Sequence, residues 1–509
     1  MTGFRPFFYL RAKEGETASS VQTAIAVNFG KSINGIKITA EQKLDAMRGF
    51  NGLQPTKVWK ISTPSLWLHK ALAKELRSGK KLGNRFVQRE DIYEANLPPY
   101  LKLFHELDLS PASPIRFEGE LGDPEDDRVD IAYEVHYSQI KPYASLNIPL
   151  YVASYDIETY SSTGLFPVAT NPGDEIMQIG VSFRWSDQML DTVARYVLVS
   201  GTVEASKDPS VTFIACSGEQ GLLLKFQQLL HSENPDILCG YNTFGFDDSY
   251  IAERAEFHKI ELQLGRSDTK QWGSRQEFVK TEKKTFELAS GKYAVRYFDL
   301  PGRLPVDLLL SVRREQNLDS YKLDNVANTF LRDKVTKIVI LTGNKQQYEI
   351  HTKSTRGLFV GNLVRFDFIG HTINPYAEGE KFHVVSVTPK SFVIESDYAG
   401  FDMDSTNLYW SFAKDDITAK QMFSAHKGTP ADRAMVAKYC IQDCDLVLTL
   451  MAKLDTLVNA RGMADVCRVP IDFIFLRGQG IKIYSAVAYN ASKRNQIIME
   501  QESAEGDTS

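Results

Sequence analysis

The stretch Tyr151-Val152-Ala153-Ser154-Tyr155-Asp156-Ile157-Glu158-Thr159 carries the first chemical signal in this sequence. Its β-branched and aromatic residues predict a strand, and side chains alternate between the two faces of a strand. Asp156 and Glu158 therefore share one face, while Ile157 points into the core. Two like charges on one face repel each other, and a divalent cation between them would turn that cost into binding. For this segment alone, an exposed strand end with two solvated acids is the alternative.

Two further segments carry acidic residues, one at the predicted start of a helix and the other on one face of a longer predicted helix. Residues 236–248 predict a short apolar strand that ends at Gly240 and a helix that starts near Asp247. An Asp at that place is an N-cap in the simplest interpretation, which explains one of the adjacent acids Asp247 and Asp248 but not both. A helix predicted from about 431 to 454 places Tyr439 and Asp443 on one face, because residues four apart are neighbours there. Alone, that pair is most simply a surface Asp beside a half-buried Tyr.

The length of 509 residues predicts about three domains, and the composition is that of a globular protein. Apolar residues make up 43% and charged residues 24% of the 509 positions, which excludes disorder, collagen and coiled coil as the main theme. No stretch reaches the ~18 uninterrupted apolar residues of a membrane helix, and the first residues do not resemble a signal peptide. The net charge of −5 restricts any nucleic-acid site to a local basic surface. The few scattered cysteines indicate a reducing compartment, so we expect a soluble protein of the nucleus or cytoplasm, a viral replication site included.

Changes of pattern along the chain predict a mixed α/β fold with an insertion. Residues 1–145 are expected to form an α+β domain, and from 146 apolar strands alternate with helices. Short strands at close spacing, one of them at 358–360, predict a small all-β, barrel-like domain at 335–413. The larger domain is expected to cover 146–334 and 414–490, and residues 491–509 to be a disordered tail.

Taken together, the three acid-bearing segments resemble the 3′→5′ proofreading exonucleases of family B DNA polymerases. That family writes them Asp-Ile-Glu-Thr, Gly-Tyr-Asn…Phe-Asp and Tyr-Cys-x-x-Asp, and all three occur here, at 156–159, 240–247 and 439–443. Segments 94–101, 302–307, 320–323 and 477–482 also resemble the family, nearest to its delta-like and large-DNA-virus branch. The resemblance thus covers about 90–490, except for 335–413.

This resemblance implies a ribonuclease H-like exonuclease domain behind an N-terminal domain of the family B type. It also implies hydrolysis of DNA 3′ ends with two divalent ions, Mg²⁺ or Mn²⁺. Asp156 would bridge both ions, Glu158 and Asp443 would complete the first site, and Asp247 would hold the second through water. The phenol of Tyr439 would orient the attacking water or the phosphate. The predicted catalytic residues are thus Asp156, Glu158, Asp247, Tyr439 and Asp443.

The same resemblance suggests which residues contact DNA. Asn242 and Phe246 are candidates for the 3′-terminal nucleotides, although Phe246 fits a core aromatic equally well. In the basic run at 70–89 the candidates for backbone contacts are Lys74, Arg77, Lys80 and Lys81, with a solvated helix face as the alternative. A hairpin predicted at 286–296 would help to separate strands or serve as plain scaffold.

The palm motifs Asp-x-x-Ser-Leu-Tyr-Pro and Tyr-Gly-Asp-Thr-Asp do not occur in the 509 residues. The sequence therefore looks like the amino-terminal half of a polymerase without palm, fingers and thumb, and 491–509 could be the start of the palm. The expected partners are primer-template DNA with a single-stranded 3′ end, the missing polymerase half, and a sliding clamp or another replication protein. No membrane partner is expected.

Two other functions stay open at this point. One is a free-standing RNA exonuclease with the same tyrosine-type site, and the other is a silent exonuclease-like module kept as a scaffold. The insertion is nearly neutral, with seven basic and eight acidic residues between 335 and 410, and a neutral module gains little from counterion release. We therefore expect it to dock a protein or the missing polymerase half, and its replacement by a Gly/Ser linker to change exonuclease activity only a few-fold.

Overall fold

The computed structural model of the chain describes residues 1–29, 34–46, 54–79, 81–83, 85–123, 131–143, 148–266, 278–341, 347–370, 372–396, 407–413 and 417–500. The chain divides into two compact units, one of residues 1–148 with 459–509 and the other of residues 149–458. The segments predicted to carry the acids all fall in the second unit.

The second unit is built on a six-stranded mixed sheet in the order β14–β13–β12–β11–β15–β18. β11 runs antiparallel to β12 and parallel to β15, while β12 and β13 are antiparallel. The pairs β13–β14 and β15–β18 are parallel. The strands are β11 (Tyr151–Tyr160), β12 (Glu175–Trp185), β13 (Thr192–Ser200), β14 (Thr212–Cys216), β15 (Ile237–Gly240) and β18 (Leu304–Asp307).

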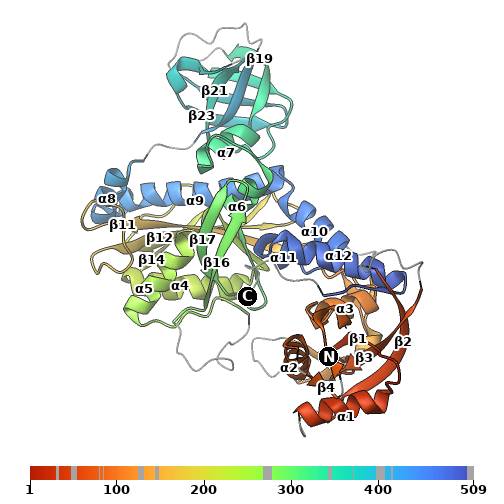
Figure 1. The fold of residues 1–509 in the computed structure, drawn as a ribbon. Helices are drawn as coiled ribbons and strands as arrows, with labels where there is room; N and C mark the ends of the chain where they lie inside the picture. Colours follow the sequence, from red (N-terminus) through yellow and green to blue (C-terminus); the bar gives the residue numbers. More distant parts are fainter. Residues whose placement is uncertain are drawn as a thin grey trace. The chain divides into compact units, whose positions relative to one another are not determined.

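Helices cover both faces of this sheet (Figure 1). α4 (Gly218–Glu233) and α5 (Asp247–His258) share one apolar cluster with Tyr155 and Ile157 of β11 and with Leu198 of β13. α9 (Pro430–Lys453) shares another with Val197 and Val199, the residues on either side of Leu198. Because side chains alternate along a strand, α9 lies on the face opposite to α4 and α5.

α9 approaches the sheet closely at Gly180, the residue of β12 that pairs with Asp156. A Cβ at this position would lie 2.9 Å from the Sγ of Cys440 and 3.1 Å from the Sγ of Cys444. Any larger residue would push the helix away from the sheet. Gly180 therefore sets the distance between the acids of β11 and the side chains of α9.

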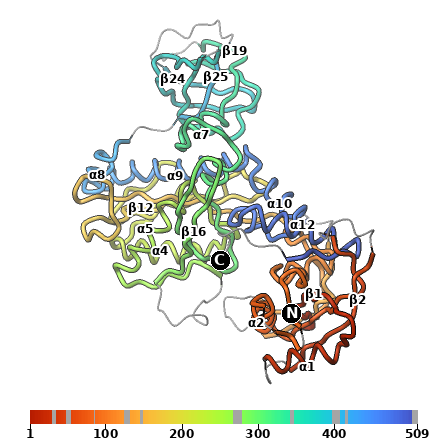
Figure 2. The backbone as a smooth tube through the Cα atoms, in the orientation of Figure 1, coloured from red at the N-terminus to blue at the C-terminus, as the bar shows by residue number. Residues whose placement is uncertain are grey.

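In the described residues, a closed β-barrel of six strands, with β22 added at its edge, is inserted between α7 (Leu323–Phe330) and α8 (Ala419–Lys427). Its sheet order is β22–β21–β23–β24–β20–β19–β25, and the further pairing of β21 with β25 closes the barrel. Figure 2 shows the trace of the inserted domain next to α7. Aromatic side chains, Phe366, Phe382, Phe392 and Trp410 among them, fill its core. The strands are β19 (Asp333–Leu341), β20 (Gln347–Thr352), β21 (Leu363–Ile369), β22 (Ile373–Pro375), β23 (Phe382–Thr388), β24 (Ser391–Glu395) and β25 (Leu408–Ala413).

The strand predicted at 358–360 is wrong, because this segment is a loop. Gly357 (φ 85°) and Gly361 (φ 89°) turn the chain on either side of it. Leu358 fills the barrel core, whereas Val360 is 65% exposed. The apolar residues of this segment thus have separate environments instead of alternating along a strand.

The described residues of the second unit also include a β-hairpin and a short helix. The predicted hairpin is formed by β16 (Thr281–Leu288) and β17 (Gly291–Phe298), which pair antiparallel. α6 (Leu308–Glu315) follows β18, and α9 extends over the residues predicted to be helical.

The first unit contains a five-stranded sheet in the order β26–β2–β3–β1–β6, with α1 and α2 packed on its core. The strands of this sheet are β1 (Phe7–Arg11), β2 (Lys37–Asp45), β3 (Thr56–Ser62), β6 (Ile92–Tyr93) and β26 (Gln496–Ile497). The other strands of the unit form two-stranded sheets: β4 (Lys81–Leu82), β5 (Arg85–Phe86), β7 (Ile115–Arg116), β8 (Glu120–Gly122), β9 (Ala132–Glu134) and β10 (Lys141–Pro142). The helices are α1 (Ala18–Phe29), α2 (Leu66–Arg77), α3 (Pro99–Glu106), α11 (Asp472–Leu476) and α12 (Gln479–Lys493), while α10 (Thr456–Cys467) spans the boundary between the units.

The carboxyl-terminal segment differs from its prediction in two respects. Residues 459–490 were expected with the exonuclease domain, but they pack with the first unit, where Phe473 and Ala488 share a cluster with Leu97 and Leu101. Residues 491–500 were expected as a disordered tail or as the start of the palm, and the first alternative is wrong for them, because α12 extends to Lys493 and β26 pairs with β2. Burial of apolar side chains distant in sequence explains both differences. Residues 501–509 lie outside the described part.

None of the helices in the described residues has the length and apolarity that a bilayer-spanning helix requires. All five cysteines are buried free thiols.

Candidate active site

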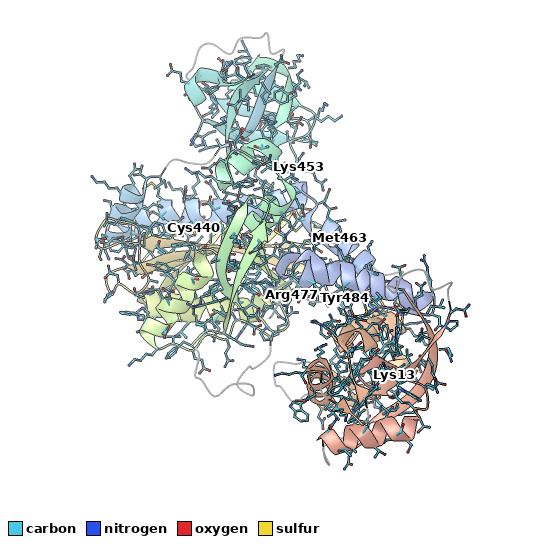
Figure 3. The ribbon with its side chains drawn as sticks, in the orientation of Figure 1. Lys13, Cys440, Lys453, Met463, Arg477 and Tyr484 are labelled. Carbon is cyan, nitrogen blue, oxygen red and sulfur yellow. The ribbon has the colours of Figure 1, made fainter. Side chains whose placement is uncertain are left out.

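The carboxylates of Asp156 and Glu158 meet the thiol of Cys440 across the gap between β11 and α9. One ligand atom from each of the three residues lies within 4.8 Å of those of the others. Cys440, labelled in Figure 3, lies on α9, and its Sγ is 3.7 Å from the backbone oxygen of Asp156. The two acids thus share a face, as the alternation of the strand predicted, and that face is turned toward α9.

α9 also carries Tyr439 and Asp443, one turn apart. Asp443 is buried and Tyr439 is half-buried. Burial raises the pKa of the Cys440 thiol well above its usual range, and the charges of Glu158, Asp156 and Asp443 raise it further. The negative charges of three predicted acids therefore favour the protonated form of this thiol. The atoms here that suit a metal ion are thus the carboxylate oxygens and not the sulfur. Such hard oxygen donors are what Mg²⁺ and Mn²⁺ prefer, so the residues fit divalent ions.

Asp247 joins the site through the backbone of β11. Its Oδ1 accepts a hydrogen bond of 3.2 Å from the N–H of Ile157, the residue between the two acids. The N-cap interpretation of Asp247 is wrong, because α5 begins with Asp247 itself and its N-cap residue is Phe246. Burial raises the pKa of Asp247 well above the ordinary value, and the neighbouring Asp248 contributes. A cation would relieve this cost of a buried negative charge.

Asp248 faces the protein interior and has a structural role. Its Oδ1 accepts from the phenol of Tyr155, and its Oδ2 accepts from the N–H of Phe298 at 3.0 Å. Burial raises the pKa of this carboxyl to about 8. The two adjacent acids thus have different partners, which the sequence did not reveal.

Asp307, which the sequence did not single out, holds the turn between Gly240 and α5. Its carboxylate accepts from the N–H groups of Asn242 at 2.9 Å, Phe244 at 3.1 Å and Leu309 at 2.9 Å. Asn242 has the left-handed φ of 64°, which Asn tolerates better than most residues. A Cβ at Gly240 would lie 2.7 Å from the backbone oxygen of Tyr155. The residue types at Gly240 and Asn242 therefore have a conformational explanation, and a DNA contact of the exposed Asn242 stays a prediction.

Phe246 is half-buried and packs on Tyr250, with ring centroids 5.4 Å apart. On its other side it meets Phe166 edge-on at 5.5 Å. Phe166 belongs to the loop that follows β11 and is 74% exposed. Sequence reasoning missed Phe166, and the signal was an apolar pair, Leu165 and Phe166, in a turn otherwise rich in Ser, Thr and Gly.

The predicted backbone contacts in the basic run have mixed surroundings. Lys74 and Lys81 are exposed. The Nε of Arg77 lies 2.5 Å from the carboxylate of the buried Glu500, so this cation is largely neutralised within the protein. Lys80 lies outside the described residues.

Comparison with known proteins gives a family match. Residues 90–326 match the family described as DNA polymerase family B, exonuclease domain. These residues, just under half of the chain, are thus similar to that exonuclease domain. The resemblance predicted from the motifs is thereby confirmed, while the third motif, with Tyr439 and Asp443, lies beyond the matched residues.

The relatives are polymerases much longer than this chain. The chain is 40% identical over 329 residues to the DNA polymerase of Pyramimonas orientalis virus, which covers 64% of this chain and 25% of that protein. It is 25% identical over 361 residues to the DNA polymerase delta catalytic subunit of Candida albicans, or 70% of this chain and 26% of that subunit. The chain thus spans only a minor part of these relatives.

A solved structure shares the fold. The family B DNA polymerase from the archaeon Pyrobaculum calidifontis superimposes with a TM-score of 0.58 at 17% identity, over 99% of this chain and 47% of that one. The predicted fold class, a mixed α/β exonuclease domain with a small inserted β-barrel, is confirmed.

Proposed function

We propose that this chain is the 3′→5′ proofreading exonuclease portion of a family B DNA-directed DNA polymerase. The observation that carries the proposal is the grouping of Asp156 and Glu158 with Cys440 of α9, with Asp247 hydrogen-bonded to the same strand. Asp156 and Glu158 face α9 at Cys440, Asp443 acts on the same thiol from α9, and Asp247 is bonded to the backbone between the first two. In the proposed site, β11, the first residue of α5 and the facing helix α9 together supply the oxygen atoms that bind metal.

In this proposal Asp156, Glu158, Asp247 and Asp443 hold two Mg²⁺ or Mn²⁺ ions. Such ions supply charge stabilisation for the attacking and leaving oxygens of a phosphodiester hydrolysis. The residues of the chain fix the donors in place: Gly180 sets the distance of α9, and Asp307 holds the turn that leads to Asp247. The phenol of Tyr439 orients the water or the phosphate by hydrogen bonding.

The substrate of the proposal is a single-stranded or frayed DNA 3′ end, with Asn242, Phe246 and the exposed Phe166 as contacts for the terminal bases. The remaining partners are primer-template DNA and the palm, fingers and thumb of the polymerase, together with a clamp or another replication protein. The protein would act in the nucleus or cytoplasm, or at a viral replication site.

A digestion assay tests the proposal. A 5′-labelled single-stranded DNA oligonucleotide is expected to be shortened stepwise from its 3′ end with Mg²⁺ or Mn²⁺, and to stay intact with EDTA. An RNA oligonucleotide of the same sequence is expected to be digested much more slowly. Preference for RNA would favour the free-standing RNA exonuclease, and absence of metal-dependent digestion would favour the silent scaffold.

Tyr439→Phe is expected to lower the single-turnover rate by about 10- to 100-fold, as is usual for a residue that orients a group by hydrogen bonding. Asp443→Ala is expected to cost at least about 10³-fold, because it removes a charged donor that stabilises the transition state. Both rates are measured at saturating DNA over a Mg²⁺ titration, with only Asp443→Ala shifting the metal dependence. Equal losses with equal metal dependence would contradict these roles.

A further inference from the structure

A pocket of about 440 Å³ lies where the inserted barrel meets α7 and α9. Gln442 and Asp443 line it from α9, and Asn328 lines it from α7. The barrel contributes Asn362, Arg365 and Lys381. Asp443, one of the candidate active-site residues, thus lines this pocket on the α9 side, and the barrel lines it on the other.

Within the second unit, the barrel contacts α7, β13 and α9. The hydroxyl of Ser411 on β25 bonds to the side-chain oxygen of Asn328 on α7 at 3.2 Å. The guanidinium of Arg195 on β13 lies 5.7 Å from the ring centre of Phe359 in the barrel loop. At Gly357 in the same loop, a Cβ would lie 2.9 Å from the side chain of Thr449 on α9. Contacts at two separate places thus fix the wall of the pocket.

Both cations of the barrel wall are placed by the fold. Arg365 donates to Oδ2 of the buried Asp367 from Nε at 3.2 Å and from Nη2 at 3.1 Å, yet its side chain is 32% exposed. Lys381 begins the approach to β23 and is half-buried. An oriented guanidinium and an ammonium on one wall are the groups that recognise a phosphate.

The rim beside these cations has an unusual backbone. Ala377 (φ 47°), Glu378 (φ 55°) and Gly379 (φ 86°) follow one another in the left-handed region. The two residues with side chains adopt this conformation only at an energetic cost, because their Cβ atoms crowd the following carbonyl oxygens. Glu378 and Gly379 line the pocket, so the strained turn is part of its wall, and such strain often accompanies a binding role.

The size and charge of the pocket indicate what it holds. Its volume falls in the ~300–1,000 Å³ range of small-ligand sites. Asp324, Glu378 and Asp443 also line it, so the two cations are outnumbered. A pocket of this size accommodates one nucleotide but not a length of DNA backbone, with the phosphate at the cationic wall and amides, Asn328, Asn362 and Gln442, around the rest.

We propose that the barrel forms a wall of the exonuclease site, and that this pocket holds one nucleotide next to the cleaved bond with its phosphate against Arg365 and Lys381. The inference rests on the proposed exonuclease function. It is an alternative to the expectation from the sequence that a Gly/Ser linker in place of the insertion changes exonuclease activity only a few-fold. That expectation followed from the net charge of the insertion, which does not show where individual charges lie.

The full chain with Arg365→Gln and Lys381→Gln tests the proposal against a control with Lys337→Gln and Lys390→Gln. The control residues are exposed lysines of the same barrel outside the pocket, so both variants lose two positive charges. The pocket variant is expected to lose about 10- to 100-fold in kcat/KM on an oligothymidylate, the usual effect of losing hydrogen bonds to a charged group. The control is expected to stay within two-fold of the parent.

Two measurements distinguish the source of the nucleotide. A raised KM for the oligothymidylate would place a nucleotide of the bound strand in the pocket. Weaker inhibition by added thymidine 5′-monophosphate at unchanged KM would place the released product there. Equal behaviour of the pocket and control variants in both measurements would overturn the proposal.

The outcomes also separate this proposal from the proposed function. If the parent digests no DNA, the exonuclease assignment fails; if the parent digests and both double variants match it, only the pocket assignment fails. Circular dichroism checks folding, and Lys381→Gln alone serves if the double variant does not fold, because it leaves the Arg365–Asp367 pair intact. That single variant is expected to show the same defect at smaller size, and parental values for it would count against the pocket.

Discussion

Asp156→Ala is expected to lower DNA digestion by at least about 10³-fold while the protein stays folded. The loss follows from the position of this carboxylate, which lies with Glu158 and Cys440 inside one 4.8 Å group. A donor that holds the ions supplies several kcal/mol of transition-state stabilisation, and each 1.4 kcal/mol is about tenfold in rate. Folding is spared because Asp156 faces Gly180 on the neighbouring strand and its removal relieves repulsion from Glu158.

Single-turnover digestion of a 5′-labelled DNA strand measures this effect, with circular dichroism as the check on folding. Asp187→Ala is the matched control, since it removes an exposed acid just after β12 in the same unit. The control is expected to digest at the parental rate. A folded Asp156→Ala protein that also digests at that rate would remove Asp156 from the site and with it the basis of the proposed function.

The part of the site that local periodicity determines could be predicted from the sequence. A period of two along β11 places Asp156 and Glu158 on one face, and Cys440 shows that this face meets α9. A spacing of four along α9 places Tyr439 and Asp443 one turn apart. Both patterns depend only on the geometry of a single element, so no knowledge of the tertiary fold was needed.

What depends on contacts between distant residues could not be predicted. Asp247 and Asp248 are adjacent in sequence, and only the tertiary fold shows that one reaches Ile157 and the other Phe298. Asp307 reads as the end of an apolar strand, yet it caps a turn more than sixty residues earlier in the chain.

The contacts of the inserted domain with the rest of the chain could not be predicted either. Apolar runs in the sequence indicated β19, β21, β23 and β24, but not β20, β22 and β25, and the strand predicted at 358–360 is a loop turned by two glycines. The place of the inserted domain beside Asp443 depends on the docking of Ser411 on Asn328 and of Gly357 on α9. Charge counts and strand patterns contain no information about such docking, so the sequence could not show that the insertion shares a pocket with Asp443.

Arg254→Met is expected to destabilise residues 149–458 by about 3–5 kcal/mol, the usual effect of removing one partner of a buried ion pair. Arg254 on α5 is 1% exposed and donates from Nε and Nη2 to Glu219 on α4 at 2.5–3.0 Å. Its Nη1 donates to the backbone oxygens of Ala169 and Asn171, in the loop that also carries Phe166. The substitution would leave the Glu219 carboxylate buried without its main cation, and methionine would fill the volume but replace none of these hydrogen bonds.

The effect is measured as a fall of about 5–10 °C in the melting temperature of this unit, together with faster hydrogen exchange in α4 and α5. Arg296→Met is the matched control, because Arg296 pairs at 3.5 Å with Glu253, the neighbour of Arg254, and both side chains are partly exposed (22% and 38%). A pair so exposed contributes only about 0–1 kcal/mol. If both variants melt within a degree or two of each other, burial does not set the strength of the Arg254 network, and the loop with Phe166 must be held by other contacts, such as those of Asp174 to Ser162 and Val168.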